Sequence, residues 1–179
     1  ARPGSVTLIE DTSAQITLEA DDPDGDSLTY SIVRQPSNGN LTGTAPELTY
    51  TPKLNFNWLD SFTFKVNDGT SDSEPATVLI TVNPANDPPK AKDDSLTIRE
   101  DTPAKKIDVL ANDTELDNEP LKITKVTKGN NGTVSINSDN TLSYIPDKDF
   151  YGTDTFTYTI SDHQNETDTA TVSVTIESL

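Results

Sequence analysis

The side chains of this sequence that could bind a ligand are mostly carboxylates, and they recur in the same order in each half of the chain. In each half, a glutamate ends the first expected strand, an acidic loop follows the second, and an aspartate follows a later, longer strand. The candidate metal-binding residues are Glu10, Asp22, Asp24, Asp26 and Asp68 in the first half, Glu100, Asp113, Asp117 and Asp162 in the second, and Asn86 and Asp87 between them.

The residue types in these clusters favour Ca²⁺ as the cofactor. Carboxylates within about 4–6 Å of one another repel by roughly a few kcal/mol per pair, so a cluster needs protons or a cation. The chain has no Cys and one His, and crowded oxygen ligands favour Ca²⁺ over transition metals and Mg²⁺. The loop is not an EF-hand, because Ser27 and Val33 occupy the positions that motif gives to Gly and Glu. The alternative for each residue is a solvated acidic turn.

No residue set points to catalysis. His163 stands beside Asp162, but nothing in the sequence places a nucleophile next to it. We therefore expect no enzymatic activity. Trp58, with Tyr30 and Tyr151, could stack on sugar rings, which leaves a carbohydrate-binding or accessory adhesion module of a polysaccharide-degrading enzyme as the alternative function. The simpler interpretation of Trp58 is a loop side chain that packs on its own domain.

The second half of the chain repeats the first at the scale of a whole domain. The matched segments are 10–12 with 100–102, 48–52 with 142–146, and 60–64 with 154–158. A repeat of about 90 residues is a domain rather than a solenoid unit of about 20–50 residues. Residues 83–89 are rich in proline and are expected to form an extended, semi-rigid linker. The expected domains are residues 1–85 and 86–179.

Apolar and polar residues alternate with period two in each half, as in the segments 62–66 and 156–160. This alternation is typical of half-buried antiparallel strands. Seven short strands in each half, separated by turn signals, predict an all-β fold with two tandem Ig-like Greek-key β-sandwich domains. Loops gather at the two ends of such a sandwich, so the acidic loop and the later aspartate can share one end. The expected strands are 5–9, 14–20, 28–33, 39–43, 47–51, 61–67 and 75–82, then 94–99, 105–110, 121–127, 132–137, 141–145, 154–161 and 168–177.

Composition limits the possible partners. The net charge is −17, from 30 Asp and Glu against 13 Lys and Arg, which argues against nucleic acid and anionic membranes because both require basic patches. No apolar run approaches transmembrane length, so we expect no direct membrane insertion. The absence of Cys excludes disulfides, and a bound metal is a common substitute in a small extracellular domain.

Several segments together resemble a cadherin repeat: 10–12, 18–26, 28–32, 66–69 and the linker residues 86–89. Both halves resemble more closely the cadherin-like and Ig-like tandem repeats of large bacterial surface and secreted proteins. The resemblance implies Ca²⁺ at the joint between successive repeats. By that resemblance, Glu10, Asn86 and Asp87 would face Asp113, Asp117 and Asp162. Asp22, Asp24 and Asp68 would serve a joint with a preceding repeat, and Glu100 a joint with a following one.

The leading hypothesis is a non-catalytic Ca²⁺-binding tandem repeat that rigidifies and extends a secreted or surface-anchored adhesin-type protein. Its expected location is extracellular or at the cell surface. Its expected partners are neighbouring repeats of the same chain. A polysaccharide or cell-surface glycan and homophilic contacts between repeats remain open as further partners.

Overall fold

The computed structural model describes residues 1–179 and divides into two compact units. The N-terminal unit spans Ala1–Ala85 and the C-terminal unit spans Asn86–Leu179. Both are built from β-strands, with a single short 3₁₀ helix in the C-terminal unit. This helix has four residues and is far too short to span a bilayer.

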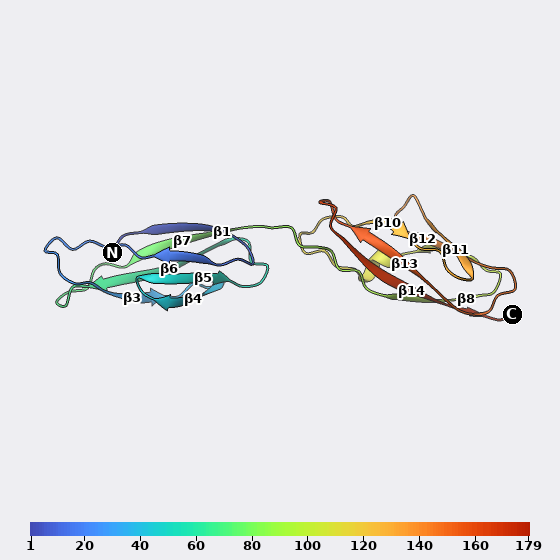
Figure 1. Ribbon diagram of the computed structural model, residues 1–179, viewed down its shortest axis with the longest axis horizontal. Helices are drawn as coiled ribbons and strands as arrows, with labels where there is room; N and C mark the ends of the chain where they lie inside the picture. The colour runs from blue at the N-terminus through green and yellow to red at the C-terminus, as the bar shows by residue number, and fades with distance from the viewer. The chain divides into compact units, whose positions relative to one another are not determined.

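The N-terminal unit is a sandwich of two sheets (Figure 1). One sheet has the strand order β1-β7-β6-β3, and the other has the order β2-β5-β4. The chain crosses between the sheets after β1, β2, β3 and β5, while β4–β5 and β6–β7 are antiparallel neighbours within one sheet, which gives the Ig-like sandwich that the sequence predicts. The strands are β1 (Gly4–Ile9), β2 (Ala14–Thr17), β3 (Thr29–Arg34), β4 (Gly39–Thr44), β5 (Glu47–Pro52), β6 (Leu59–Asn67) and β7 (Ala76–Asn83).

The C-terminal unit repeats this arrangement. One sheet has the order β10-β13-β14-β8 and the other the order β11-β12-β9. Its strands are β8 (Asp94–Arg99), β9 (Ala104–Ile107), β10 (Lys122–Val126), β11 (Gly132–Ile136), β12 (Leu142–Pro146), β13 (Gly152–Ser161) and β14 (Thr167–Glu177), and the 3₁₀ helix η1 is Val109–Asn112. The all-β class and the two Ig-like domains predicted from the sequence are therefore confirmed.

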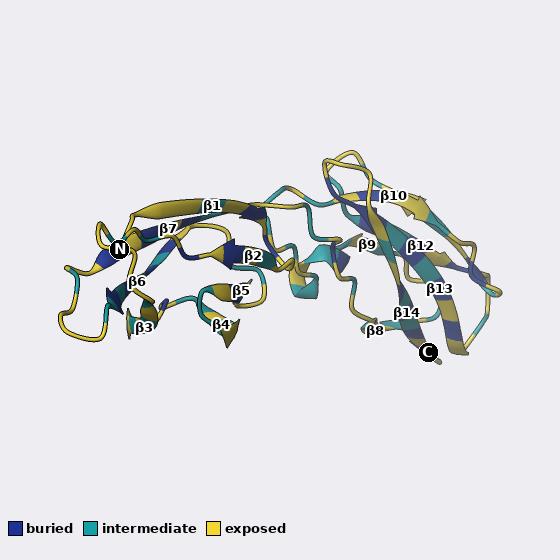
Figure 2. Ribbon diagram, turned by 60° about the vertical axis from the view of Figure 1, so that its left-hand side comes forward, coloured by how far each residue is buried: buried dark blue, intermediate teal, exposed yellow.

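The alternation of apolar and polar residues produces the two cores. Along β13 and β14, buried and more exposed residues follow one another, which Figure 2 shows as bands along the strands. In the N-terminal unit, Tyr50, Phe62 and Phe64 have no exposed surface, and Tyr144 and Tyr158 are equally buried in the C-terminal unit. Side chains that face inward from both sheets thus form one core in each unit.

The first and last strands of each unit lie side by side and run parallel. β1 pairs with β7 from Gly4 opposite Val78 to Ile9 opposite Asn83, and β8 pairs with β14 in the same way. Each unit therefore begins at one end of its sandwich and finishes at the other. The end where β1 starts carries the acidic loop and the turn after β6, and the end where β1 finishes carries Glu10.

Two strands are shorter than the sequence predicts. The expected strand 14–20 ends at Thr17, because the chain then leaves its sheet and the Glu19 carbonyl accepts a hydrogen bond from the Arg2 N–H at 2.9 Å. The expected strand 105–110 ends at Ile107 and turns into η1. All other strands lie within two residues of their predicted bounds.

The η1 turn follows from one difference between the repeats. Tyr158 occupies the position of Phe64, and its buried hydroxyl needs polar partners. The turn brings the Val109 carbonyl to 3.1 Å and the Asp113 carboxylate to 3.0 Å from that hydroxyl. Phe64 has no hydroxyl group that needs a hydrogen-bond partner, and the N-terminal unit has no helix at this place.

Candidate functional site

Glu10 is the most deeply buried of the predicted metal-binding residues. It follows β1, and its side chain is 2% exposed. One carboxylate oxygen, Oε1, accepts hydrogen bonds from the Ala85 N–H at 2.8 Å and from Asn57 Nδ2 at 3.2 Å. The other oxygen, Oε2, is buried without a protein donor. A buried anionic oxygen without a partner is costly, so this atom fits a cation or a proton.

The linker residues Asn86 and Asp87 are tied to two of the predicted acidic residues within the C-terminal unit. Asn86 Nδ2 donates to Asp162 Oδ2 at 2.8 Å, and the Asp87 N–H donates to Asp117 Oδ2 at 2.9 Å. Asn86 Oδ1 is buried without a hydrogen-bond partner. This end of the unit therefore gathers carboxylate and amide oxygens, the ligand type that Ca²⁺ prefers.

Asp162 is held in place by the turn between β13 and β14. Its side chain is 7% exposed, and Oδ1 accepts from the N–H groups of Gln164 at 2.9 Å and Glu166 at 2.8 Å. The Asn86 amide and these backbone donors lower the pKa of Asp162, against the raising effect of burial. Asp162 is thus an ionised, fixed carboxylate at neutral pH.

Asp113 is engaged in a different network. Its Oδ1 accepts from the Lys92 N–H at 2.8 Å and from the Tyr158 hydroxyl at 3.0 Å. The same hydroxyl also lies 2.9 Å from the Lys92 carbonyl and 3.1 Å from that of Val109. One hydroxyl proton cannot serve all of these acceptors. The network is therefore short of donors.

Asp94 shares this shortage. Its Oδ2 is buried and has no hydrogen-bond partner. Burial raises the pKa of Asp94, and the nearby carboxylates of Asp113, Asp93 and Asp108 raise it further. Burial also raises the pKa of Asp113, with Asp168 adding to the effect. Asp94 was not predicted from the sequence. The signal was present, because Asp94 aligns with Gly4 and is therefore an acidic residue without a counterpart in the first repeat.

In the acidic loop of the N-terminal unit, the Asp22 side chain fixes the backbone of the residues that follow it. Asp22 Oδ1 accepts from the N–H groups of Asp24 at 2.9 Å and Asp26 at 3.0 Å. Asp24 and Asp26 are exposed. The alternative interpretation, a solvated turn formed by Asp side chains, describes the hydrogen bonds of this loop well.

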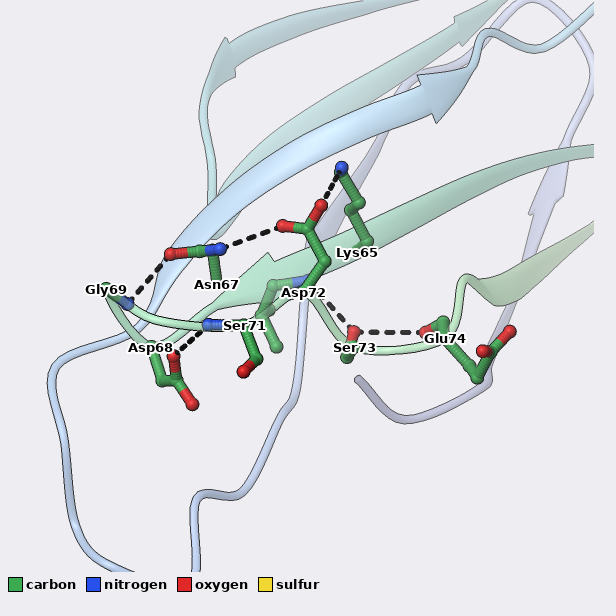
Figure 3. A network of polar contacts seen from close by, with 9 residues as sticks. Lys65, Asn67, Asp68, Gly69, Ser71, Asp72, Ser73 and Glu74 are labelled. Atoms are coloured by element: carbon green, nitrogen blue, oxygen red, sulfur yellow. Dashed lines mark hydrogen bonds and ion pairs between the residues drawn. The ribbon is translucent and has the colours of Figure 1, made fainter.

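The turn after β6 holds Asp68 in a similar way (Figure 3). Asp68 Oδ1 accepts from the N–H groups of Thr70 and Ser71, each at 2.7 Å, and the donors of Ser71 and then Thr70 lower its pKa. Asp72 forms an ion pair with Lys65 in the same turn. Asp22, Asp68 and Asp72 line one hollow of about 140 Å³, so the acidic loop and the later aspartate do share one end of this sandwich.

Glu100 repeats part of the role of Glu10. The Glu100 N–H donates to the Glu177 carbonyl at 2.9 Å, as the Glu10 N–H donates to that of Asn83 at 2.9 Å. Glu100 Oε1 accepts from the Leu179 N–H at 2.6 Å, at the end of the C-terminal unit. In both repeats, a glutamate after the first strand thus holds the backbone of the last residue of its unit.

A buried tyrosine–aspartate pair in each unit was not singled out by sequence reasoning. The Tyr50 hydroxyl donates to Asp60 Oδ2 at 3.0 Å, and that of Tyr144 donates to Asp154 Oδ2 at 2.8 Å. Asp60 also accepts from the N–H groups of Ser37, Asn38 and Ser61. Burial raises the pKa of Asp60, but these four donors outweigh it and lower the pKa below its ordinary value. The signal was in the repeat, which conserves both the Tyr and the Asp of each pair.

The aromatic candidates differ in exposure. Trp58 is 74% exposed and Tyr151 is 66% exposed, so the interpretation of Trp58 as a side chain that packs on its own domain is wrong. The chain reaches Trp58 on an exposed loop just before β6, which holds the ring off the core. Tyr30 stacks on Phe64 with the ring centroids 6.2 Å apart. His163 is exposed in a turn, and its backbone N–H donates to Glu119 Oε2 at 3.1 Å.

Comparison with known proteins agrees with this architecture. A family model described as a Bacterial Ig domain matches residues 1–81 and again residues 86–175. Among curated proteins, integrin beta-like protein A of Dictyostelium discoideum is 27% identical over 96% of this chain. The chain spans 11% of that relative's length.

Solved structures with the same fold include cadherin repeats. The human mucin-like protocadherin EC1-2 aligns with 99% of this chain and 97% of its own, at 18% identity and a TM-score of 0.57. Human CDH23 EC21-23 aligns with 98% of this chain and 72% of its own, at 16% identity and a TM-score of 0.61. The resemblance to bacterial Ig-like and cadherin-like repeats is therefore confirmed at the level of the fold.

Proposed function

The chain consists of two tandem members of the Bacterial Ig domain family, and from that premise we propose that it is a non-catalytic, Ca²⁺-binding spacer of a secreted or surface-anchored adhesin-type protein. The proposed partners are further repeats of the same kind. The proposed location is outside the cell. The metal-binding roles that the sequence predicts for individual residues are part of this proposal.

The observation that carries the proposal is the buried, unpartnered oxygen of Glu10. At 2% exposure, Oε2 is removed from water yet receives no protein hydrogen bond. Asn86 Oδ1 in the C-terminal unit is buried and unpartnered as well. Both are hard oxygen atoms next to the linker, and the donor set lacks the nitrogen and sulfur ligands that transition metals favour. The residues present therefore fit Ca²⁺.

The roles of the chain's own groups follow from their contacts. Glu10 supplies one free oxygen while Oε1 fixes the last residue of its unit, Ala85. Asp162 and Asp117 are held by Asn86 and by the Asp87 N–H, which places the start of the C-terminal unit next to its own acidic residues. When bound, Ca²⁺ neutralises the carboxylates around it. By the resemblance to cadherin repeats, we expect the bound ion to limit the motion of one repeat against the next.

The size of the effect can be bounded. Extracellular Ca²⁺ modules bind with Kd of about 10⁻⁴–10⁻³ M. At about 10 mM Ca²⁺, mass action then stabilises the native state by about 1.4–2.7 kcal/mol. Thermal unfolding of the intact chain in 10 mM Ca²⁺ and in EDTA is the direct test, with small-angle scattering on the same samples to measure the largest dimension and its spread.

A matched pair of variants sharpens the test. Glu10→Gln keeps the shape of the side chain but removes the charge, so we expect the Ca²⁺-dependent gain in melting temperature to fall by more than half. Glu74→Gln removes an exposed carboxylate and should leave the gain unchanged. Identical melting temperatures and dimensions with and without Ca²⁺ in the unsubstituted chain would rule the proposal out.

A further inference from the structure

Trp58 forms the wall of an uncharged surface hollow that the proposed ion-binding role does not use. The hollow has a volume of about 310 Å³. It lies wholly on the N-terminal unit, where Trp58 is 74% exposed and Leu59 is 50% exposed. Its lining consists of Asn57, Trp58, Leu59, Thr81, Val82, Asn83 and Pro84. A large exposed aromatic ring beside other apolar side chains commonly marks a binding surface.

The backbone beneath the ring is fixed. The Trp58 carbonyl accepts from the Val82 N–H at 3.0 Å, and Leu59 pairs with Thr81 at the start of the β6–β7 ladder. The side chain of Asn57 is held by its hydrogen bond to Glu10 at 3.2 Å. The loop backbone that carries the ring is therefore tied to β7 by a hydrogen bond, which reduces the entropy lost when a ligand binds.

The lining selects for a neutral ligand. None of its seven residues is charged, although the whole chain has 30 acidic residues and a net charge of −17. That overall charge repels polyanions, and the hollow itself offers no carboxylate to a basic peptide. Asn83 and Thr81 add amide and hydroxyl groups that can both donate and accept hydrogen bonds. An aromatic face with such groups at its edge matches a pyranose, which has an apolar C–H face and a rim of hydroxyl groups.

We propose that this hollow, here named the Trp58 platform, binds a neutral polysaccharide through stacking of a sugar ring on Trp58. The volume lies at the low end of the range for small-ligand sites, which fits contact with one or two sugar units. The C-terminal unit has Gly152 at the position of Trp58, so a platform of this composition belongs to the N-terminal unit alone. The lining includes no carboxylate, so we expect this binding to need no Ca²⁺.

The test uses the intact 179-residue chain in native affinity electrophoresis with soluble neutral polysaccharides: barley β-glucan, arabinoxylan and galactomannan. Alginate serves as the anionic comparison. We expect retardation by at least one neutral polymer, none by alginate, and the same result in Ca²⁺ and in EDTA. Trp58 is the only tryptophan, so protection of its fluorescence from acrylamide quenching reports on the ring directly.

Variants distinguish stacking on the Trp58 ring from nonspecific adsorption to exposed apolar side chains. Trp58→Ala should weaken binding by about tenfold or more, because it removes the stacking surface. Trp58→Phe should retain part of the binding. Leu54→Ala removes an exposed apolar side chain, 82% exposed, from outside the hollow and should bind normally. Because Trp58 is exposed, all three variants should fold.

Three results would overturn the proposal. One is the absence of retardation and quenching protection with every neutral polymer. Another is retardation that Trp58→Ala leaves unchanged. The last is self-association of the chain in sedimentation velocity that disappears in Trp58→Ala, which would make the platform a contact between copies. None of these results bears on the response to Ca²⁺, so the platform and the spacer role fail or stand separately.

Discussion

The buried carboxylate of Asp60 offers the sharpest test of how each unit is held together. It is 7% exposed and accepts hydrogen bonds from four donors: the backbone N–H groups of Ser37, Asn38 and Ser61 at 2.8–3.0 Å, and the Tyr50 hydroxyl at 3.0 Å. These bonds join the segment before β4, the strand β5 and the start of β6. Removing the charge should therefore weaken contacts among three parts of the unit.

The magnitude follows from the number of donors. Asp60→Asn keeps the shape but replaces one acceptor oxygen with an NH₂ group, which must face two of the four donors. Breaking a buried charged network of this kind costs about 3–5 kcal/mol. Tyr50→Phe removes one donor and leaves the carboxylate with three, so it should cost about 1–2 kcal/mol. A unit of 85 residues has a total stability of about 4–13 kcal/mol, so Asp60→Asn should remove a large share of it.

The assay must report on each unit separately. Urea unfolding at pH 7, followed by pulsed hydrogen exchange and mass spectrometry, reads peptides from β5 and β6 for the N-terminal unit and from β12 and β13 for the C-terminal unit. Asp154→Asn is the matched control, because it alters the equivalent pair in the C-terminal unit. It should shift the β12 and β13 peptides and leave those of β5 and β6 unchanged. A smaller loss from Asp60→Asn than from Tyr50→Phe would refute the reasoning.

Three further outcomes concern Asp60 and two other positions. The pKa of Asp60 is lowered in the folded state. The contribution of its carboxylate to the free energy of unfolding is therefore complete above the unfolded-state pKa of about 3.9 and is lost as the pH falls through the lower folded-state pKa. Urea unfolding midpoints measured at pH 7, 5 and 3 will show this loss. The pKa of Asp94 is raised in the folded state, so its ionisation costs stability as the pH rises above about 3.9. Asp94→Asn should therefore stabilise the C-terminal unit by about 1 kcal/mol at pH 7. Calorimetry should show no gain below pH 4. Gly39→Ala places a methyl group where it overlaps the Tyr50 ring and should cost about 1–3 kcal/mol in urea unfolding, whereas Gly4→Ala, with its nearest contact at 3.8 Å, should cost less.

The fold could be predicted from the sequence because two signals agree. The alternation of apolar and polar residues marks the strands, and the second repeat confirms each of them independently. The failures lie where tertiary contacts override the local pattern. The segment 105–110 alternates like a strand, yet Val109–Asn112 turn to meet the Tyr158 hydroxyl. No local rule shows that a tyrosine half a domain away requires this.

The candidate site was less predictable, since the sequence counts carboxylates but does not show which oxygens are already in use. Asp22 and Asp68 each commit one oxygen to backbone N–H groups of their own turns. Asp113 is drawn toward Tyr158, while Glu10 keeps one oxygen without a partner. This distinction depends on the positions of donors from other strands. The roles of these residues in binding Ca²⁺ remain predictions.

The parallel pairing of the first and last strands has a mechanical consequence for each unit. Tension applied through the two ends of a unit pulls β1 and β7 in opposite directions along their length, because they are adjacent and point the same way. The hydrogen bonds of this six-residue pairing then bear the load together, as in a sheared joint, and cannot be unzipped one at a time. The same geometry holds for β8 and β14. In each unit, the pairing of the first and last strands thus carries the load in a shear geometry that resists rupture.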